Sequence, residues 1–154
     1  MSARPFALIA AAAMVGGFFL PWMSAPTGAS LVPFDAVKGL DSTQLQDMLT
    51  SLPPEGMAFF ASFALAALLV LLGLMGAAPR LIVFVTGAIP VGFVAWGLYS
   101  AMTQGNAMGV PVTGTDLMQI AEEVSRLLGP GAWAWLGGGA LLFLMGLFGT
   151  GSRR

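Results

Sequence analysis

The stretch that decides the fold covers residues 57–102 and reads MAFFASFALAALLVLLGLMGAAPRLIVFVTGAIPVGFVAWGLYSAM. It consists of two long apolar runs separated by Ala78-Pro79-Arg80. No charged residue lies between Glu55 and Arg80, or between Arg80 and Asp116. About 20 apolar residues in a helix match the ~30 Å hydrocarbon core of a bilayer. The stretch therefore predicts a helical hairpin that crosses a membrane twice and turns at Arg80.

The composition of the whole chain agrees with a membrane protein. Hydrophobic residues make up 57% of the sequence and charged residues 8%, whereas a soluble domain carries roughly 25% charged residues. The net charge of −1 predicts no nucleic-acid partner. Cysteine and histidine are both absent, which removes disulfides, thiolate nucleophiles, the commonest general base and the usual metal ligands. We therefore expect no metal site, no cofactor and no enzymatic activity.

Two further apolar runs extend the hairpin to an all-α protein with four membrane spans. The predicted spans cover residues 5–23, 57–77, 81–102 and 132–148. Pro90 is expected to kink the third span because proline removes one helical hydrogen bond. A signal peptide is the alternative interpretation of the first span. Cleavage after Ala25 would place Met23 where a small residue is needed, and cleavage after Ala29 stays open. We expect an uncleaved helix.

Each of the two predicted outer loops, residues 24–56 and 103–131, contains a short amphipathic helix. Asp41-Ser42 is expected to cap the first helix and Thr115 the second, because their side-chain oxygens can accept free N–H groups of a first turn. Apolar residues recur at helical spacing in both. These residues are the candidate outer docking surface: Leu45, Met48, Leu49, Leu52, Leu117, Ile120, Val124 and Leu127.

Charge and aromatic residues predict the same orientation. All seven acidic residues fall in the outer loops, whereas Arg4, Arg80, Arg153 and Arg154 fall on the other side. The positive-inside rule then places both termini in the cytoplasm. The segment Phe19-Leu20-Pro21-Trp22 is similar to the first-span exit of many small bacterial membrane proteins, so we expect a bacterial inner membrane. The expected headgroup anchors at the outer ends of the spans are Trp22, Trp96, Tyr99, Trp133 and Trp135.

The two halves of the single domain, residues 1–154, resemble each other at an offset of 75–76 residues. Arg4 aligns with Arg80, and Gly56 with Gly131. Because each half contains two crossings, residues 1–77 and 78–154 are predicted to be tandem helical-hairpin repeats in parallel orientation. The alternative is that two unrelated apolar hairpins align about equally well.

The predicted spans contain no ionisable residue, which argues against a proton pump or an ion-selective pore. Isolated Ser62, Thr86 and Ser100 are expected to bond backbone carbonyls of their own helices. Small residues allow helices to approach closely in lipid, either within this bundle or against a partner. The candidate helix-packing residues are Ala12, Gly16, Gly73, Ala77, Ala88, Gly92, Gly137 and Gly138. The ten methionines are expected to fill gaps in the bundle rather than bind copper.

These features favour a non-catalytic accessory or scaffold subunit that packs against a larger integral membrane complex and is otherwise surrounded by membrane lipid. The alternative is a module that binds or transports an apolar ligand, such as a lipid, quinone or pigment, since such a ligand needs no charged residue. The overall plan resembles that of tetraspanning proteins such as the claudins, with cytoplasmic ends and a longer first outer loop. The resemblance is architectural, because the loop cysteines of claudins have no counterpart here.

Overall fold

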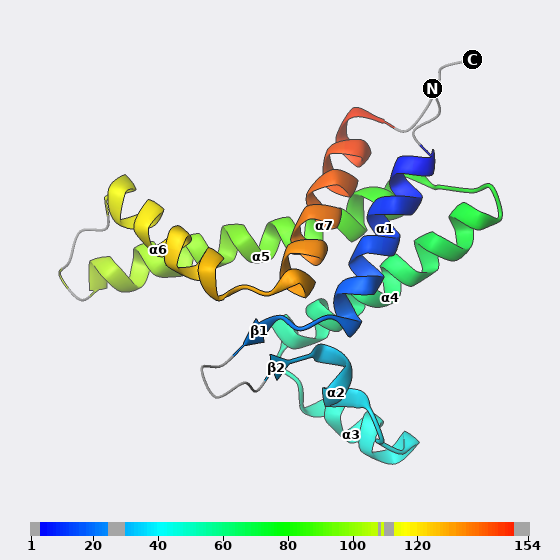
Figure 1. The fold of residues 1–154 in the computed structure, drawn as a ribbon, viewed down its shortest axis with the longest axis horizontal. Helices are drawn as coiled ribbons and strands as arrows, with labels where there is room; N and C mark the ends of the chain where they lie inside the picture. Colours follow the sequence, from blue (N-terminus) through cyan, green and yellow to red (C-terminus); the bar gives the residue numbers. More distant parts are fainter. Residues whose placement is uncertain (1–3, 25–29, 108, 110–112, 150–154) are drawn as a thin grey trace.

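The computed structural model describes residues 4–24, 30–107, 109 and 113–149. Over these residues the chain forms a bundle of apolar helices: α1 (Arg4–Phe19), α4 (Pro54–Leu74), α5 (Arg80–Ala107) and α7 (Pro130–Phe148). Helix α7 packs against α1 and α5, and α4 contacts the same two helices (Figure 1). The Arg153-Arg154 tail and the proposed cleavage sites at Ala25 and Ala29 lie outside the described residues.

Three helices in the described part of the chain, α4, α5 and α7, are long and apolar enough to cross a membrane. Such helices indicate a multi-pass membrane protein. Helix α1 is shorter than the predicted span 5–23, with 16 residues and a length of about 24 Å. It ends at Phe19 because Pro21 disfavours a helical conformation at the residue before it, and the chain becomes extended at Met23–Ser24 (β1).

The other apolar helices begin earlier than predicted. Pro54 and Pro130 occupy first-turn positions of α4 and α7, where proline needs no hydrogen-bond partner for its nitrogen. Helix α4 ends at Leu74, and Gly76 follows with a φ of +84°, a conformation that glycine adopts without steric cost. Helix α5 continues through Pro90 and extends to Ala107, so it includes the first residues of the segment predicted as the second outer loop.

Short elements form two polar lobes outside the apolar bundle. The first contains β1, β2 (Ser30–Leu31), α2 (Pro33–Val37) and α3 (Ser42–Ser51), and the second contains α6 (Gly114–Leu127). Both longer helices begin with a capping box, formed by Asp41 with Gln44 in α3 and by Thr113 with Asp116 in α6. The Asp41 cap was predicted correctly. The Thr115 cap was wrong, because Asp116 pairs with Thr113 and helix α6 therefore begins earlier.

Glycines on two sides of α7 bring it close to its neighbours. A Cβ atom on Gly138 would lie 2.5 Å from the carbonyl oxygen of Ala10 in α1. A Cβ atom on Gly139 would lie 2.5 Å from the Pro90 ring in α5. Gly87 of α5 lies directly against the backbone of Phe143. The missing side chains thus allow the backbones to pack by dispersion, which holds helices together in lipid.

The two ends of the bundle differ in their connections. At one end, the Arg80 side chain donates hydrogen bonds to the carbonyl oxygens of Gly146 (2.8 Å) and Leu147 (2.7 Å) at the end of α7. At the other end, the Gly129 N–H donates to the Trp22 carbonyl (2.6 Å) and the Gly131 N–H to the Pro21 carbonyl (3.1 Å). The start of α7 is therefore joined to the exit from α1, and its end to the start of α5.

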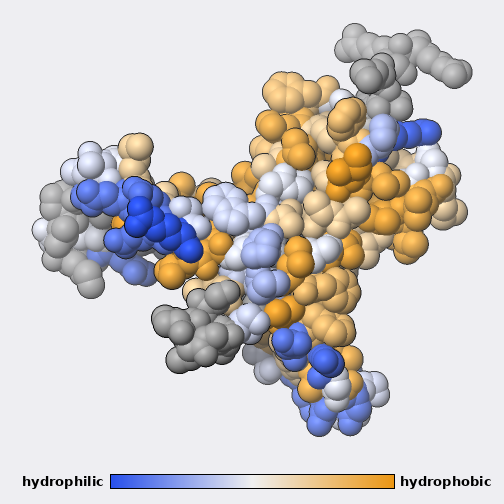
Figure 2. Space-filling model, viewed as in Figure 1, coloured by the Kyte–Doolittle hydropathy of each residue, from blue (hydrophilic) through white to orange (hydrophobic). Residues whose placement is uncertain are grey.

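The polar surface is concentrated on the outer lobes. In the face shown in Figure 2, hydrophilic residues gather over α6 and α3, and hydrophobic residues cover much of α1, α4 and α7. Helices α3 and α6 contribute no buried residue. The apolar bundle and the two polar lobes are therefore distinct parts of the molecule.

Candidate functional site

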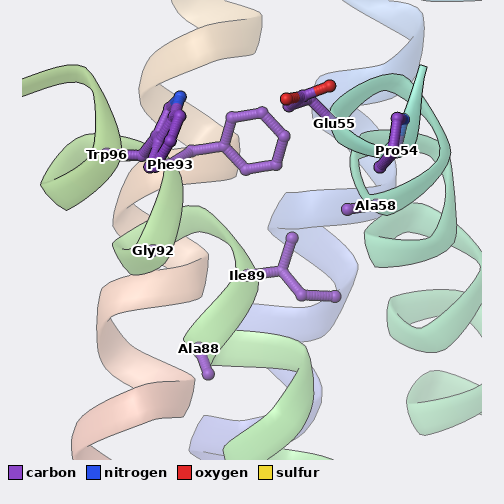
Figure 3. A pocket seen from close by; sticks show the side chains of 8 residues that line it. All are labelled: Pro54, Glu55, Ala58, Ala88, Ile89, Gly92, Phe93 and Trp96. Carbon is purple, nitrogen blue, oxygen red and sulfur yellow. The ribbon is translucent and has the colours of Figure 1, made fainter. Parts of the chain in front are cut away.

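An open apolar groove of about 380 Å³ runs between α4 and α5 (Figure 3). The α4 side is built from the first turns of that helix, and the α5 side from residues spaced three and four apart, which share one helical face. The groove is lined by Pro54, Glu55, Ala58, Ala88, Ile89, Gly92, Phe93 and Trp96. Its volume lies within the ~300–1,000 Å³ range of small-molecule sites.

Small residues create the space in this groove. Ala88 and Gly92 lie one turn apart on α5 and face Ala58 of α4. Outside the adjacent turns of α5, no described atom would lie within 4 Å of a Cβ atom on Gly92. A partner helix, an acyl chain or another slender apolar group can therefore lie along this face without moving the protein.

The groove has one polar end. The Glu55 carboxylate lies at the same end as the Trp96 indole, whereas Ala88 lies at the opposite end (Figure 3). Glu55 is in the first turn of α4, where the helix dipole favours a negative charge. Trp96 is 58% exposed. The groove is therefore amphipathic along its length.

Two further apolar grooves lie along the bundle. One, of about 370 Å³, separates the second half of α5 from α7 and includes Val94, Leu98 and Leu136. The other, of about 360 Å³, lies between α1 and α4 and includes Ala12 and Val70. The second half of α5 is thus flanked by a groove on each side, because it diverges from α7 beyond the contact at Pro90 and Gly139 (Figure 1).

A buried aromatic cluster lies beside the α4–α5 groove. Trp135 is 4% exposed and donates a 2.9 Å hydrogen bond from its indole nitrogen to the hydroxyl of Ser62. The Ser62 hydroxyl donates in turn to the Phe59 carbonyl oxygen (2.6 Å). Phe93 joins the cluster, with its ring centroid 5.7 Å from that of Trp135. Through Phe93, which also lines the groove, this cluster forms part of the groove wall.

The aromatic residues predicted as headgroup anchors fall into two groups. Trp96, Tyr99 and Trp133 are each more than half exposed, as an anchor must be. Trp135 lies elsewhere than expected, in the core of the bundle. Trp22 is half-buried, and its indole donates to the Gly17 carbonyl oxygen (2.7 Å). Neither indole N–H is therefore free to bond lipid headgroups.

The predicted small-residue contacts also fall into two groups. Gly73 lies against Leu8, and Gly138 against Ala10, as close packing requires. Gly16, Gly92 and Gly137 would each meet nothing within 4 Å outside the adjacent turns of their own helix if they carried a Cβ atom, so no other helix in the described part of the chain lies close at those positions. The other predicted packing residues line grooves or lie exposed: Ala12 and Ala88 in grooves, and Ala77 in the turn after α4.

The candidate docking surface is open in both outer helices. In α6, the exposed fraction is 45% for Ile120, 45% for Val124 and 59% for Leu127, while Leu117 is half-buried. In α3, Leu49 is exposed, and the half-buried residues are Leu45, Met48 and Leu52. The two surfaces lie in separate lobes (Figure 1) and do not form one continuous patch.

Sequence reasoning missed the α4–α5 groove. It singled out Ala88, Gly92 and Trp96 for other roles, although their spacing of four places all three on one face of α5. That spacing was the available signal for the α5 wall. No sequence pattern predicts the α4 wall, including Glu55, because that wall depends on the angle at which the two helices diverge.

The described part of the bundle buries few polar side chains. Polar side chains buried in the bundle are satisfied within it, as Ser62 and Thr86 show by donating to carbonyl oxygens of their own helices. No group of three or more acidic residues that could hold a metal ion is found among the residues that the structure describes. Comparisons with protein-family models, curated proteins and solved structures found no match. The fold is that of a helical multi-pass membrane protein, with apolar grooves along its bundle and exposed apolar side chains on α5 and α6.

Proposed function

We propose that this protein is a non-catalytic accessory or scaffold subunit that packs against a larger integral membrane complex. The observation that carries this proposal is the apolar surface that the second half of α5 and α6 leave exposed in the described part of the chain. In α5 the exposed side chains include Val94, Leu98 and Met102. Large exposed apolar surfaces mark contacts with proteins or membranes.

The proposal includes four membrane crossings, with α1 as the shortest. Several features support it. Arg4 approaches Gly76 in the turn after α4, since a Cβ atom there would lie 4.0 Å from the Arg4 guanidinium, and Arg80 contacts the end of α7. These cations gather at one end of the bundle, away from α3 and α6, so the positive-inside rule favours a cytoplasmic location for this end and for both termini. We assign the protein to a bacterial inner membrane on the similarity of its first-span exit.

The tandem-repeat proposal is supported by the order of the elements. Helices α1 and α5 begin at Arg4 and Arg80, and α4 and α7 begin at Pro54 and Pro130, which gives the same offset for both pairs. An amphipathic helix with a capping box precedes α4 in one half and α7 in the other. The halves differ in that α1 is much shorter than α5.

Extraction in a mild detergent tests the accessory role. We expect the tagged chain to copurify with an integral membrane partner at fixed stoichiometry. The double variant Ile120→Glu/Val124→Glu should lose this partner without a lower unfolding temperature, because α6 contributes no buried residue. Glu122→Gln, on the opposite face of α6, is the control and should keep the partner. Recovery of only the lone chain under native extraction would contradict the proposal.

A second candidate function, binding of an apolar ligand, is favoured by the α4–α5 groove. The groove is open, apolar along most of its length and polar at one end. A lipid, quinone or pigment would be detected as a small molecule enriched in the organic extract of the purified protein. An extract that matches the bulk membrane composition would contradict this candidate.

A further inference from the structure

We propose that the α4–α5 groove holds one membrane phospholipid whose headgroup carries a primary ammonium, with the ammonium at Glu55 and Trp96 and an acyl chain along Gly92 and Ala88. This inference deepens the ligand-binding candidate and rests on the proposed membrane placement. It follows from the shape of the groove, its charge and the hydrogen-bonding capacity of its lining.

The shape fits an acyl chain. The floor between Gly92 and Ala88 carries no bulky side chain, and Ile89 and Phe93 supply apolar walls (Figure 3). The groove opens along the side of the bundle, where a lipid can enter without crossing a protein barrier. Its apolar end points away from Glu55, as a chain entering the hydrocarbon region would require.

The charge fits a cationic headgroup. Glu55 is the ionisable residue in the lining, and the lining contains no basic residue. Arg80 lies at the other end of α5 and bonds the end of α7, and Arg126 of α6 pairs with Glu122 at 2.6 Å. A headgroup with a net negative charge would therefore meet the Glu55 carboxylate with no cation in the lining of the groove. An ammonium group is attracted both to that carboxylate and to the face of the Trp96 indole.

The hydrogen-bonding capacity separates a lipid amine from other apolar ligands. A carboxylate accepts hydrogen bonds and donates none, and proline has no backbone N–H. A quinone presents carbonyl oxygens, which could accept from the Trp96 indole N–H, but it offers no donor to the Glu55 carboxylate. A primary ammonium donates three hydrogen bonds, so it complements Glu55, whereas a quaternary ammonium is attracted by charge alone.

Native mass spectrometry of the full chain after reconstitution tests this assignment. The protein is incubated with equal amounts of phosphatidylethanolamine, phosphatidylcholine and phosphatidylglycerol that carry identical acyl chains. We expect wild type to retain one phosphatidylethanolamine, with roughly two- to fivefold preference over each of the others. This is the size expected for an exposed ion pair with Glu55, to which phosphatidylcholine cannot donate a hydrogen bond and in which phosphatidylglycerol has no cation. Equal retention of the three lipids would overturn the proposal.

Variants locate the site. Glu55→Gln should keep a bound lipid but lose the headgroup preference, and Gly92→Leu should lose the lipid because its side chain fills the groove. Gly97→Leu is the matched control: Gly97 is also on α5 with open space around it and does not line the groove, so retention should equal that of wild type. Unfolding temperatures of both leucine variants show that the fold is intact. Undiminished, selective retention by Gly92→Leu would overturn the assignment.

The same residue distinguishes a lipid from a protein occupant. A photoreactive amino acid at position 92 should label phospholipid in native membranes, and selective labelling of a protein would overturn the lipid assignment while supporting the accessory role. Loss of selective lipid retention by the isolated chain would overturn the lipid assignment but not the accessory role, because that measurement does not require a partner subunit.

Discussion

At the residue scale, glycines determine how closely α7 approaches its neighbours. Gly137, Gly138 and Gly139 are consecutive, yet their surroundings differ completely. Gly138 faces α1, Gly139 faces the Pro90 ring, and Gly137 faces open space. A sequence can indicate that such residues permit close packing, but it cannot assign their faces here, because uniformly apolar helices have no polar side to orient them.

This difference gives a matched pair of substitutions. Gly138→Ala should destabilise the bundle by about 1–3 kcal/mol, the typical cost of overpacking, because its Cβ atom would meet the Ala10 carbonyl oxygen at 2.5 Å. Gly137→Ala should leave stability unchanged or raise it slightly, since alanine is the better helix former. Thermal unfolding in detergent micelles measures both. Equal effects of the two substitutions would contradict the observed packing of α7.

The hydrogen bond from Trp135 to Ser62 gives a second prediction. Ser62→Ala removes the acceptor of the buried Trp135 indole (2.9 Å) and should cost about 0.5–2 kcal/mol, the range for polar contacts between membrane helices. The added substitution Trp135→Phe removes the orphaned N–H, so the double variant should lose less stability than the sum of the two single losses. Simple additivity in denaturant or thermal unfolding would show that the two side chains do not interact.

At the element scale, the helices that a sequence predicts best are those defined by local signals. The Asp41 cap of α3 follows from local residues, and so does the Glu122–Arg126 pair on α6. The start of α6 was misplaced because Thr113 and Thr115 are both chemically suitable caps, and only the pairing with Asp116 distinguishes them. The early end of α1 reflects the conformational effect of Pro21, which hydropathy alone does not register.

The capping box of α6 makes its first turn sensitive to acid. The pKa of Asp116 is lowered because its carboxylate accepts hydrogen bonds from the Thr113 backbone N–H (3.0 Å) and the Thr113 hydroxyl (2.8 Å). Because the pKa of Asp116 is lower in the folded state than in the unfolded chain, its carboxylate stabilises this turn at pH values above the unfolded-state pKa. This stabilisation is lost as the pH falls through the lowered, folded-state pKa.

Carbon-13 NMR of the Asp116 carboxyl group in the full chain measures this effect. We expect a titration midpoint below the ordinary aspartate value, with helical chemical shifts in the first turn of α6 fading over the same pH range. Thr113→Val keeps the backbone donor but removes the hydroxyl, so it should shift the midpoint part of the way back. An unchanged midpoint in that variant would show that the hydroxyl does not contribute.

At the scale of the whole molecule, the apolar bundle and its two polar lobes were within reach of the sequence, because charge and hydropathy are segregated along the chain. The α4–α5 groove was not. Its walls come from Glu55 and Trp96, far apart in sequence, and its opening depends on how α5 diverges from its neighbours after the Pro90–Gly139 contact. Residue spacing predicts the face of one helix, whereas a groove requires the relative placement of two.

The central proposal is that the chain crosses the membrane four times and places both polar lobes on the same side. Paired reporters that are active either inside or outside the cell, inserted in α3 near Asp47, in α6 near Ser125 and after Arg154, measure this directly. We predict external signals from both lobes and an internal signal from the C-terminus. Signals from the two lobes on opposite sides, or an external C-terminus, would contradict the proposed topology.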